Sequence, residues 1–236
     1  MVIIGLILSR SEAELSKIRT ARNRALPRQV IAGMAFVSGF CIMTIEMLGV
    51  RILSPYFGGS LSVWGSIITI FMLALALGYL FGGRLSTHNP SAATFALFFI
   101  GAGAFSLPVI LLADPIMRPI FLTIEDPRYG SLFAAIFLFF IPTSILGMIS
   151  PYAVRLMVQH EEQSGQMAGL LYFVSTLGSA AGTLGTSFYF VLWFEVNQIL
   201  WGTVAILILS GGLILATHTL LNLQSFKSSS GQANSA

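Results

Sequence analysis

The chain has 236 residues, of which 56% are hydrophobic and only 9% are charged, and its formal net charge is +3. A soluble domain carries roughly 25% charged residues, so this composition excludes an ordinary water-soluble protein. Six of the twelve Lys and Arg residues lie in the first 28 positions. A basic segment just before an apolar run is typical of membrane topology and of anionic-lipid binding, so we expect no nucleic-acid partner.

The N-terminal segment 1–29 is predicted to be a basic cytoplasmic or interfacial region. Within it, residues 11–27 are predicted to form a helix, because Ser11 and Glu14 make a capping box and apolar residues recur along one stripe. Basic side chains fill the other faces of this helix. This pattern favours an amphipathic helix that lies on the membrane surface and binds anionic lipid.

Six apolar runs follow, and each is long enough to cross a bilayer, which takes about 20 mostly apolar residues. We therefore expect an all-α membrane protein with about six transmembrane helices in a domain covering 30–223, followed by a disordered tail at 224–236. The longest linker, 114–130, contains three prolines. The predicted spans are 30–53, 61–84, 92–113, 131–150, 166–192 and 198–221.

The distribution of positive charge predicts the orientation of the chain. With the N-terminus in the cytoplasm, nine of the Lys and Arg residues face the cytoplasm and three, Arg51, Arg118 and Arg128, face the opposite side. Because positive residues gather on the cytoplasmic side of a membrane, we expect both termini to be cytoplasmic.

A tripeptide recurs at two points of the apolar region. Ser-Pro-Tyr occurs at 54–56, where it is expected to end the first span, and at 150–152, where it is expected to end the fourth. Pro55 and Pro151 would then act as hinges. Because three spans separate the copies, they would have opposite orientations, which predicts a 3+3 inverted repeat like those of many secondary transporters.

A glycine pair follows each copy of the tripeptide. Gly78 and Gly82 are four residues apart in the second predicted span, and Gly178 and Gly182 are four apart in the fifth. Such pairs let two helix backbones approach closely, so we expect these glycines to pack helices. Small residues at this spacing are common in membrane helices, so chance recurrence is the alternative to a repeat.

Glu46 is the only acidic residue well inside a predicted span. A carboxylate in the bilayer is costly and usually faces a cavity or a partner, so Glu46 is a candidate cation or proton site. The alternative is a structural pair with a Tyr, Trp or Arg side chain of another helix. The other candidates for the solute or proton site are Tyr56, Trp64, Pro142 and Tyr172. Aromatic residues near span ends also suit the membrane interface, and Pro142 also suits a packed kink.

We expect no catalytic residue, no cofactor and no metal site. The histidines His88, His160 and His218 are far apart and have no Cys or second His at ligand spacing. The single cysteine, Cys41, lies in the first apolar run and cannot form an intramolecular disulfide.

Two stretches carry motifs in a recognisable order and spacing. In the first half, these motifs are Ser38-Gly39, Glu46, Arg51-Ile52-Leu53-Ser54-Pro55-Tyr56-Phe57-Gly58, Val63-Trp64-Gly65, Leu75-Ala76-Leu77-Gly78-Tyr79 and Gly82-Gly83-Arg84-Leu85. In the second half, they are Pro142-Thr143, Leu146-Gly147-Met148, Pro151, Arg155, Gly165, Gly169-Leu170-Leu171-Tyr172, Thr176-Leu177-Gly178 and Gly182. Over residues 30–200, the chain resembles the membrane-embedded region of membrane-bound spermidine synthase-like proteins, the major-facilitator/spermidine synthase fusion family.

The resemblance implies a soluble, Rossmann-type aminopropyltransferase domain after the spans. This sequence has no Gly-rich nucleotide loop and no strand–helix alternation after the last span, so the family's catalytic residues have no positions here. We therefore expect a stand-alone membrane domain, not an enzyme, that transports or channels a polyamine or another cation in a prokaryotic inner membrane. The alternatives are a structural or anchoring subunit of a larger complex, the membrane partner of a separate enzyme subunit, and a homo-oligomer.

Overall fold

The computed structural model describes residues 26–87, 90–158 and 164–233. Every regular element in these ranges is a helix, and six helices are long and apolar enough to cross a membrane. The prediction of an all-α fold with six helices long and apolar enough to cross a membrane is confirmed. The predicted surface helix at 11–27 lies outside the described residues, apart from Leu26 and Pro27.

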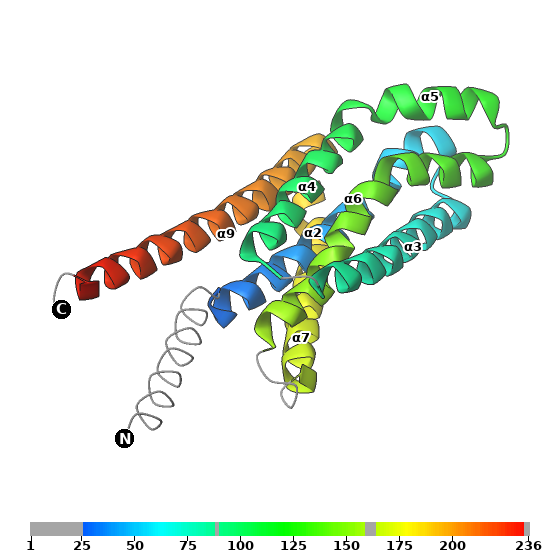
Figure 1. Cartoon of the computed structure of the whole chain (residues 1–236). Helices are drawn as coiled ribbons and strands as arrows, with labels where there is room; N and C mark the ends of the chain where they lie inside the picture. Colours follow the sequence, from blue (N-terminus) through cyan, green and yellow to red (C-terminus); the bar gives the residue numbers. More distant parts are fainter. Residues whose placement is uncertain (1–25, 88–89, 159–163, 234–236) are drawn as a thin grey trace, which may run out of the picture.

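The spans follow one another in chain order, and a short helix joins the third to the fourth (Figure 1). They are α2 (Arg28–Phe57), α3 (Leu61–Ser86), α4 (Ala92–Leu111), α6 (Pro127–Met157), α7 (Ser164–Leu184) and α9 (Val196–Ala233). The span of α7 continues through the π-helical segment η2 (Gly185–Phe190) and one turn of helix, α8 (Val191–Trp193). The joining helix is α5 (Ala113–Thr123). We call the end of the molecule beside α5 the α5 end, and the end where α2 begins and α9 finishes the terminal end.

Two segments outside the predicted spans contain helix. Part of the predicted linker 114–130 forms α5, which passes through Pro119, and α6 begins within it at Pro127. Proline is well tolerated in the first turn of a helix, where its missing N–H has no partner to lose. The predicted tail from residue 224 also differs, because α9 continues as helix to Ala233. This stretch has no proline, so each added residue can extend the hydrogen-bonded ladder.

The two Ser-Pro-Tyr copies were predicted to end the first and fourth spans, and this is correct within one residue for the first copy and wrong for the second. The helix α2 continues through Pro55 to Phe57, and α6 continues through both Pro142 and Pro151 to Met157. Membrane helices tolerate proline where neighbouring helices and hydroxyl side chains compensate for the lost backbone hydrogen bond.

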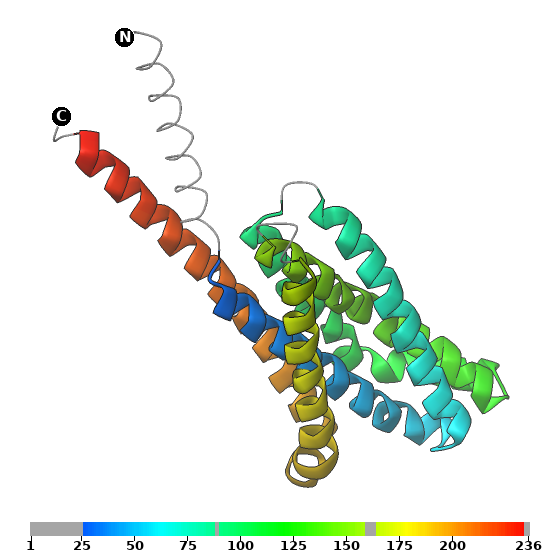
Figure 2. The same cartoon turned by 90° about the horizontal axis from the view of Figure 1, so that it is seen from below.

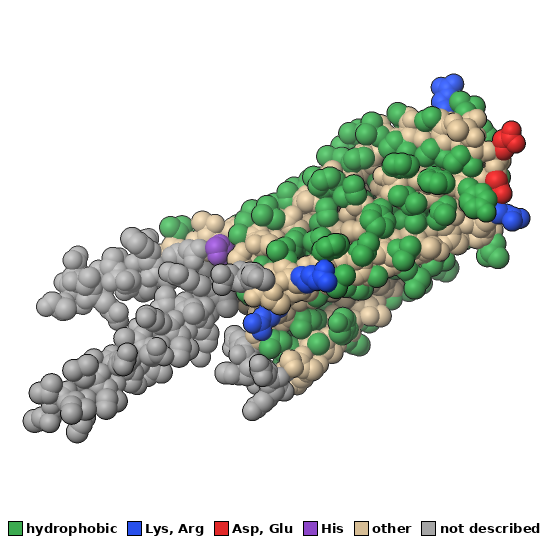
Figure 3. All heavy atoms as spheres, turned by 45° about the vertical axis from the view of Figure 1, so that its right-hand side comes forward, with side chains coloured by type: hydrophobic (Ala, Val, Ile, Leu, Met, Phe, Trp, Pro, Cys, Tyr) green, Lys and Arg blue, Asp and Glu red, His purple; other side chains and the backbone are tan. Residues whose placement is uncertain are grey.

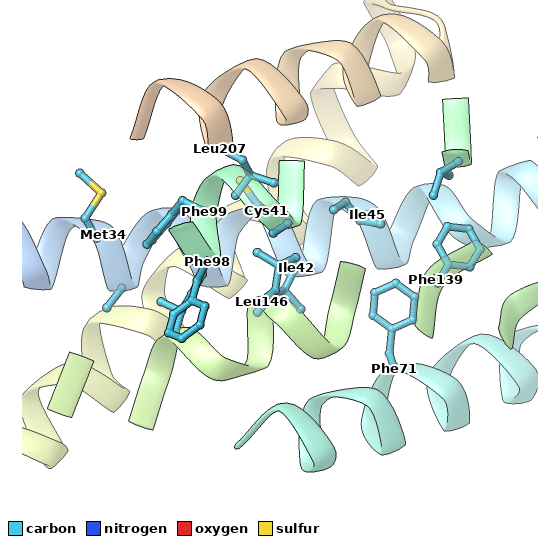
Figure 4. Packing of buried hydrophobic residues seen from close by; sticks show 14 of the residues in the cluster. Met34, Cys41, Ile42, Ile45, Phe71, Phe98, Phe99, Phe139, Leu146 and Leu207 are labelled. Carbon is cyan, nitrogen blue, oxygen red and sulfur yellow. The ribbon is translucent and has the colours of Figure 1, made fainter. Parts of the chain in front are cut away.

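The helices pack mainly across the two halves of the chain: α3 lies against α6, α2 against α7, and α4 against α9. The fully buried side chains of Phe71 on α3 and Phe139 on α6 have ring centroids 5.7 Å apart. Cys41, Phe99 and Leu207 bring α2, α4 and α9 together in the same core (Figure 4). Lipid tails are as apolar as these side chains, so shape-matched packing is what holds such helices together.

The glycine pair of α3 lies against the backbone of α6. A Cβ atom added at Gly82 would lie 2.6 Å from both the Cα and the carbonyl oxygen of Met148. One at Gly78 would lie 2.9 Å from the Cα of Gly147. Backbone atoms cannot rotate away as a side chain can, so any larger residue here would force the two helices apart.

The glycine pair of α7 lies against α2 in the same manner. A Cβ atom at Gly178 would lie 3.0 Å from the Cα of Phe36, and one at Gly182 would lie 3.1 Å from the Cα of Phe40. These contacts place α7 across α2 on the outside of the bundle (Figure 2), where α7 is the least buried of the six spans.

The surface has the charge distribution of a membrane protein. Figure 3 shows acidic side chains at the α5 end, basic side chains toward both ends and apolar side chains over the face between them. A broad apolar band between charged ends suits a bilayer, whose hydrocarbon core is about 30 Å thick.

Candidate functional site

A crevice of about 200 Å³ opens between α2, the first turn of α3 and η2. It lies toward the α5 end of α2, and we call it the α3–η2 crevice. Its lining combines a guanidinium, an indole and two hydroxyl groups with aliphatic side chains: Met47, Val50, Arg51, Trp64, Thr186, Ser187 and Val191. The crevice therefore offers both polar and aromatic contacts at the depth of a membrane span.

Glu46 is not one of the lining residues, but it lies close to them along α2. It precedes the lining residue Met47 directly, and it is one helical turn from Val50, on the same side of α2 and toward the terminal end. The Glu46 side chain is partly buried. Within residues 26–87, 90–158 and 164–233 it has no hydrogen-bond or ion-pair partner. The structural pair that we considered as the alternative for Glu46 is thus not formed with any described residue.

Arg51 supplies the positive charge of the crevice. It is exposed on α2 and lies five residues beyond Glu46, about 140° further round the helix at 3.6 residues per turn. That angle keeps the guanidinium and the carboxylate on different faces, and they form no ion pair. The carboxylate therefore remains available to an incoming cation or proton, while Arg51 lies nearer the α5 end.

The segment η2 forms one wall of the crevice. Its Thr186 is buried, and the Thr186 hydroxyl donates a hydrogen bond to Oγ1 of Thr44 on α2, with 3.2 Å between the two oxygens. π-Helical segments are rare and occur frequently at functional sites, because they change the direction of side chains within a helix. The sequence predicted an unbroken helix over 166–192, so η2 and its threonine were missed; no propensity pattern distinguishes such a segment.

The structure places one of the five predicted site residues, Trp64, in the crevice lining, and Glu46 is outside that lining, one helical turn from Val50. Tyr56 lies instead at the α5 end, where its hydroxyl donates to Oδ1 of Asp114 across 3.2 Å. Pro142 is buried within α6, and Tyr172 is 60% exposed on α7. These three residues do not line the crevice.

The part of the chain that the structure describes contains no group of three or more His, Cys, Asp or Glu side chains placed to hold a metal ion. In comparisons with known proteins, no family model, no curated protein and no solved structure matches the chain. The functional interpretation therefore rests on the residues and geometry of the chain itself.

Proposed function

We propose that the chain is a membrane module that transports or channels a small cation through the α3–η2 crevice, with Glu46 as the group that binds the cation or exchanges a proton. The observation that carries this proposal is a carboxylate inside a membrane span with no partner among the described residues. Ionisable side chains within spans are costly, and they typically belong to ion pathways or proton relays. A polyamine is one cation of suitable chemistry, and the resemblance to spermidine synthase-like membrane proteins, which rests on sequence motifs alone, favours it.

The proposal includes two inverted halves, α2–α4 and α6–α9, as in secondary transporters that alternate access around a central site. The helix contacts support this arrangement. This repeat exchanges the two halves: α2 corresponds to α6, α3 to α7, and α4 to α9. The contact between α3 and α6 then corresponds to the contact between α7 and α2, and α4 and α9 contact each other. The contact of α4 with α6 likewise becomes that of α9 with α2.

Individual glycine contacts support the same exchange. A Cβ atom at Gly103 of α4 would lie 3.0 Å from Cγ1 of Ile208 on α9, and one at Gly211 of α9 would lie 2.5 Å from Cγ1 of Ile100 on α4. The two glycines are 108 positions apart in the sequence, and so are the two isoleucines. Adding 108 to the residue numbers of α4 therefore converts one contact into the other.

The glycines of the central helices α2 and α6 have the same spacing. Gly39 of α2 approaches the backbone of Ser175 on α7, and Gly147 of α6 approaches the backbone of Leu75 on α3. Gly39 and Gly147 again differ by 108 positions. Their contact partners Ser175 and Leu75 differ by 100 positions, as do the glycine pairs of α3 and α7, and the Ser-Pro-Tyr copies differ by 96, so the register of 108 positions relates α2 to α6 and α4 to α9 only.

We place the module in a prokaryotic inner membrane with both termini in the cytoplasm. Among the described residues, Arg28, Arg84 and Arg155 lie at the terminal end and Arg51, Arg118 and Arg128 lie toward the α5 end, so these six residues are evenly divided. The proposed orientation therefore rests on the sequence, in which six of the twelve Lys and Arg residues lie in the first 28 positions, because positive residues gather on the cytoplasmic side.

The test is flux into sealed proteoliposomes that contain the purified chain. Two probes are used: radiolabelled putrescine outside the vesicles, and a pH-sensitive dye inside them. We expect uptake above that of empty vesicles, and a loss of at least tenfold in Glu46→Gln. The matched control, Glu125→Gln, changes an exposed acid at the α5 end and should leave the flux unchanged. Equal flux in Glu46→Gln and wild type would overturn the role of Glu46.

A second candidate function is a structural or anchoring subunit of a larger membrane complex. The outer face of α7 and η2 favours it, because large aromatic side chains are exposed there: Tyr172, Phe173, Phe188 and Tyr189. Such a face suits a partner helix as well as lipid. This candidate predicts a stoichiometric partner in mass spectrometry of material purified in mild detergent, and no flux from the chain alone.

A further inference from the structure

A second cavity, of about 260 Å³, lies on the other side of η2, between α2 and α9. We call it the α9 pocket. Its lining is mostly apolar, with aromatic rings from α2 and η2 and, from α9, aliphatic and hydroxyl side chains: Phe40, Thr44, Phe190, Ile199, Thr203 and Ile206. It is separate from the α3–η2 crevice, whose lining contains none of these six residues.

The other half of the molecule holds a tyrosine ring in the corresponding place. Tyr152 of α6 is 1% exposed and packs against the start of α4. Its ring stacks on Phe95, with centroids 6.2 Å apart and 8° between the planes, and meets Phe98 edge-on at 5.1 Å. Its hydroxyl oxygen accepts a hydrogen bond from the backbone N–H of Ser91 across 2.9 Å. The tyrosine thus fills its seat and satisfies an N–H at the end of a helix.

The exchange of halves, on which this inference rests, relates that seat to the α9 pocket. The spacing of 108 positions takes Tyr152 to Thr44. Three residues surround the tyrosine: Ser91, Phe95 and Phe98. With the same spacing, their counterparts on α9 are Ile199, Thr203 and Ile206. All three of these counterparts line the α9 pocket, and so does Thr44. The pocket is therefore the same seat, left open because a threonine side chain occupies the position of the tyrosine.

We propose that the α9 pocket binds a single aromatic ring that carries an oxygen substituent, a ligand of phenol size. The α9 pocket is open on one side, and its volume of about 260 Å³ exceeds the roughly 150 Å³ of an enclosed apolar cavity that binds benzene, so it has room for one ring with a substituent. The filled seat in the other half shows the ring shape that the surrounding helices accommodate.

The polar groups of the pocket suit an oxygen atom on the ring. Oγ1 of Thr44 accepts the hydrogen bond from Thr186, so the hydroxyl hydrogen of Thr44 is available to donate to a ligand oxygen. At the rim, Oε1 of Gln198 accepts from the backbone N–H of Glu195 at 3.1 Å, which leaves the amide NH₂ of Gln198 for a second contact. The pocket thus offers hydrogen-bond donors, and no carboxylate lines it.

The test uses 4-fluorophenol as the probe, followed by ¹⁹F NMR with the purified chain in lipid nanodiscs. We expect saturable binding of one probe per chain, competed by p-cresol, which is the side chain of tyrosine. The variant Gly202→Phe projects a ring into the pocket from α9 and should weaken binding at least tenfold. Gly212→Phe is the matched control on the same helix, because a Cβ atom at either glycine meets no atom within 4 Å and only Gly202 lines the pocket.

Two further variants exchange the seats. Thr44→Tyr should fill the pocket and abolish saturable binding, whereas Tyr152→Thr should open the second seat and raise the stoichiometry to two probes per chain. Non-saturable partition that is equal in wild type and Thr44→Tyr would overturn the proposal, as would saturable binding that survives both Thr44→Tyr and Gly202→Phe. Saturable binding of a dodecyl-chain probe in place of the phenol would identify an acyl-chain groove and would also overturn it. This readout needs no flux, so its failure is distinct from failure of the transport proposal.

Discussion

The close approach of α3 and α6 gives the sharpest stability prediction. In Gly82→Ala, the new methyl carbon would lie 2.6 Å from the Cα and the carbonyl oxygen of Met148. Carbon atoms pack best at about 3.5–4.0 Å, so the two backbones must separate locally by about 1 Å. Overpacking of this kind costs about 1–3 kcal/mol.

Gly83→Ala on the same helix is the matched control. No atom lies within 4 Å of a Cβ at Gly83. Replacing glycine by alanine within a helix gains about 1 kcal/mol in helix propensity, and this gain applies to both variants. The difference in unfolding free energy between Gly82→Ala and Gly83→Ala therefore isolates the packing effect, and we expect Gly82→Ala to be less stable by about 1–3 kcal/mol.

The assay is equilibrium unfolding in mixed micelles of SDS and a mild detergent, followed by circular dichroism. The same comparison on α7, Gly182→Ala against Gly169→Ala, should give a difference of the same sign, because a Cβ at Gly169 also meets nothing within 4 Å. Equal stabilities of Gly82→Ala and Gly83→Ala would refute the close backbone crossing.

Four further substitutions have defined outcomes in the same unfolding assay. The buried hydroxyl groups of Ser38 and Thr143 have no hydrogen-bond partner among the described residues, so Ser38→Ala and Thr143→Val should stabilise the fold by about 1 kcal/mol each; a loss of stability would contradict this. Tyr152→Phe removes the hydrogen bond from Ser91 and should destabilise by about 1 kcal/mol, with unchanged stability as the contrary result. Glu46→Leu should raise the unfolding free energy by at least about 1 kcal/mol while flux is lost, because an unpaired carboxylate is removed from the membrane; lower stability would indicate an unrecognised structural pair.

Hydropathy and length predict the spans well because a bilayer requires a long apolar run wherever the chain crosses it. The predicted starts at 61 and 92 coincide with the first residues of α3 and α4. The rules for proline were less useful, because they describe helices in water. Pro55 and Pro151 sit within continuous membrane helices, where neighbouring protein compensates for the lost hydrogen bond.

Which residues face one another was harder to predict. In a membrane protein both the core and the lipid-facing surface are apolar. The hydrophobicity of the residues along a helix therefore does not show which side faces the core. Tyr172 was therefore placed near the candidate site although it is exposed on α7. Glu46 and Trp64 were identified because a charge inside a span and an indole near its end are unusual in composition alone. The correspondence of Tyr152 with Thr44 has no signature in sequence, because it depends on contacts between distant helices.

The central claim is that the α3–η2 crevice, close to Glu46 along α2, admits water and solute. The most direct test is cysteine labelling with a membrane-impermeant maleimide in intact vesicles, in a background where Cys41 is replaced by alanine. Ser187→Cys lines the crevice and should react, whereas Phe188→Cys, at the same depth and outside the crevice lining, should not. Labelling of Ser187→Cys should also decrease when putrescine is present. Absence of labelling at Ser187→Cys would mean that the crevice is closed to water, and would contradict a solute path at this site.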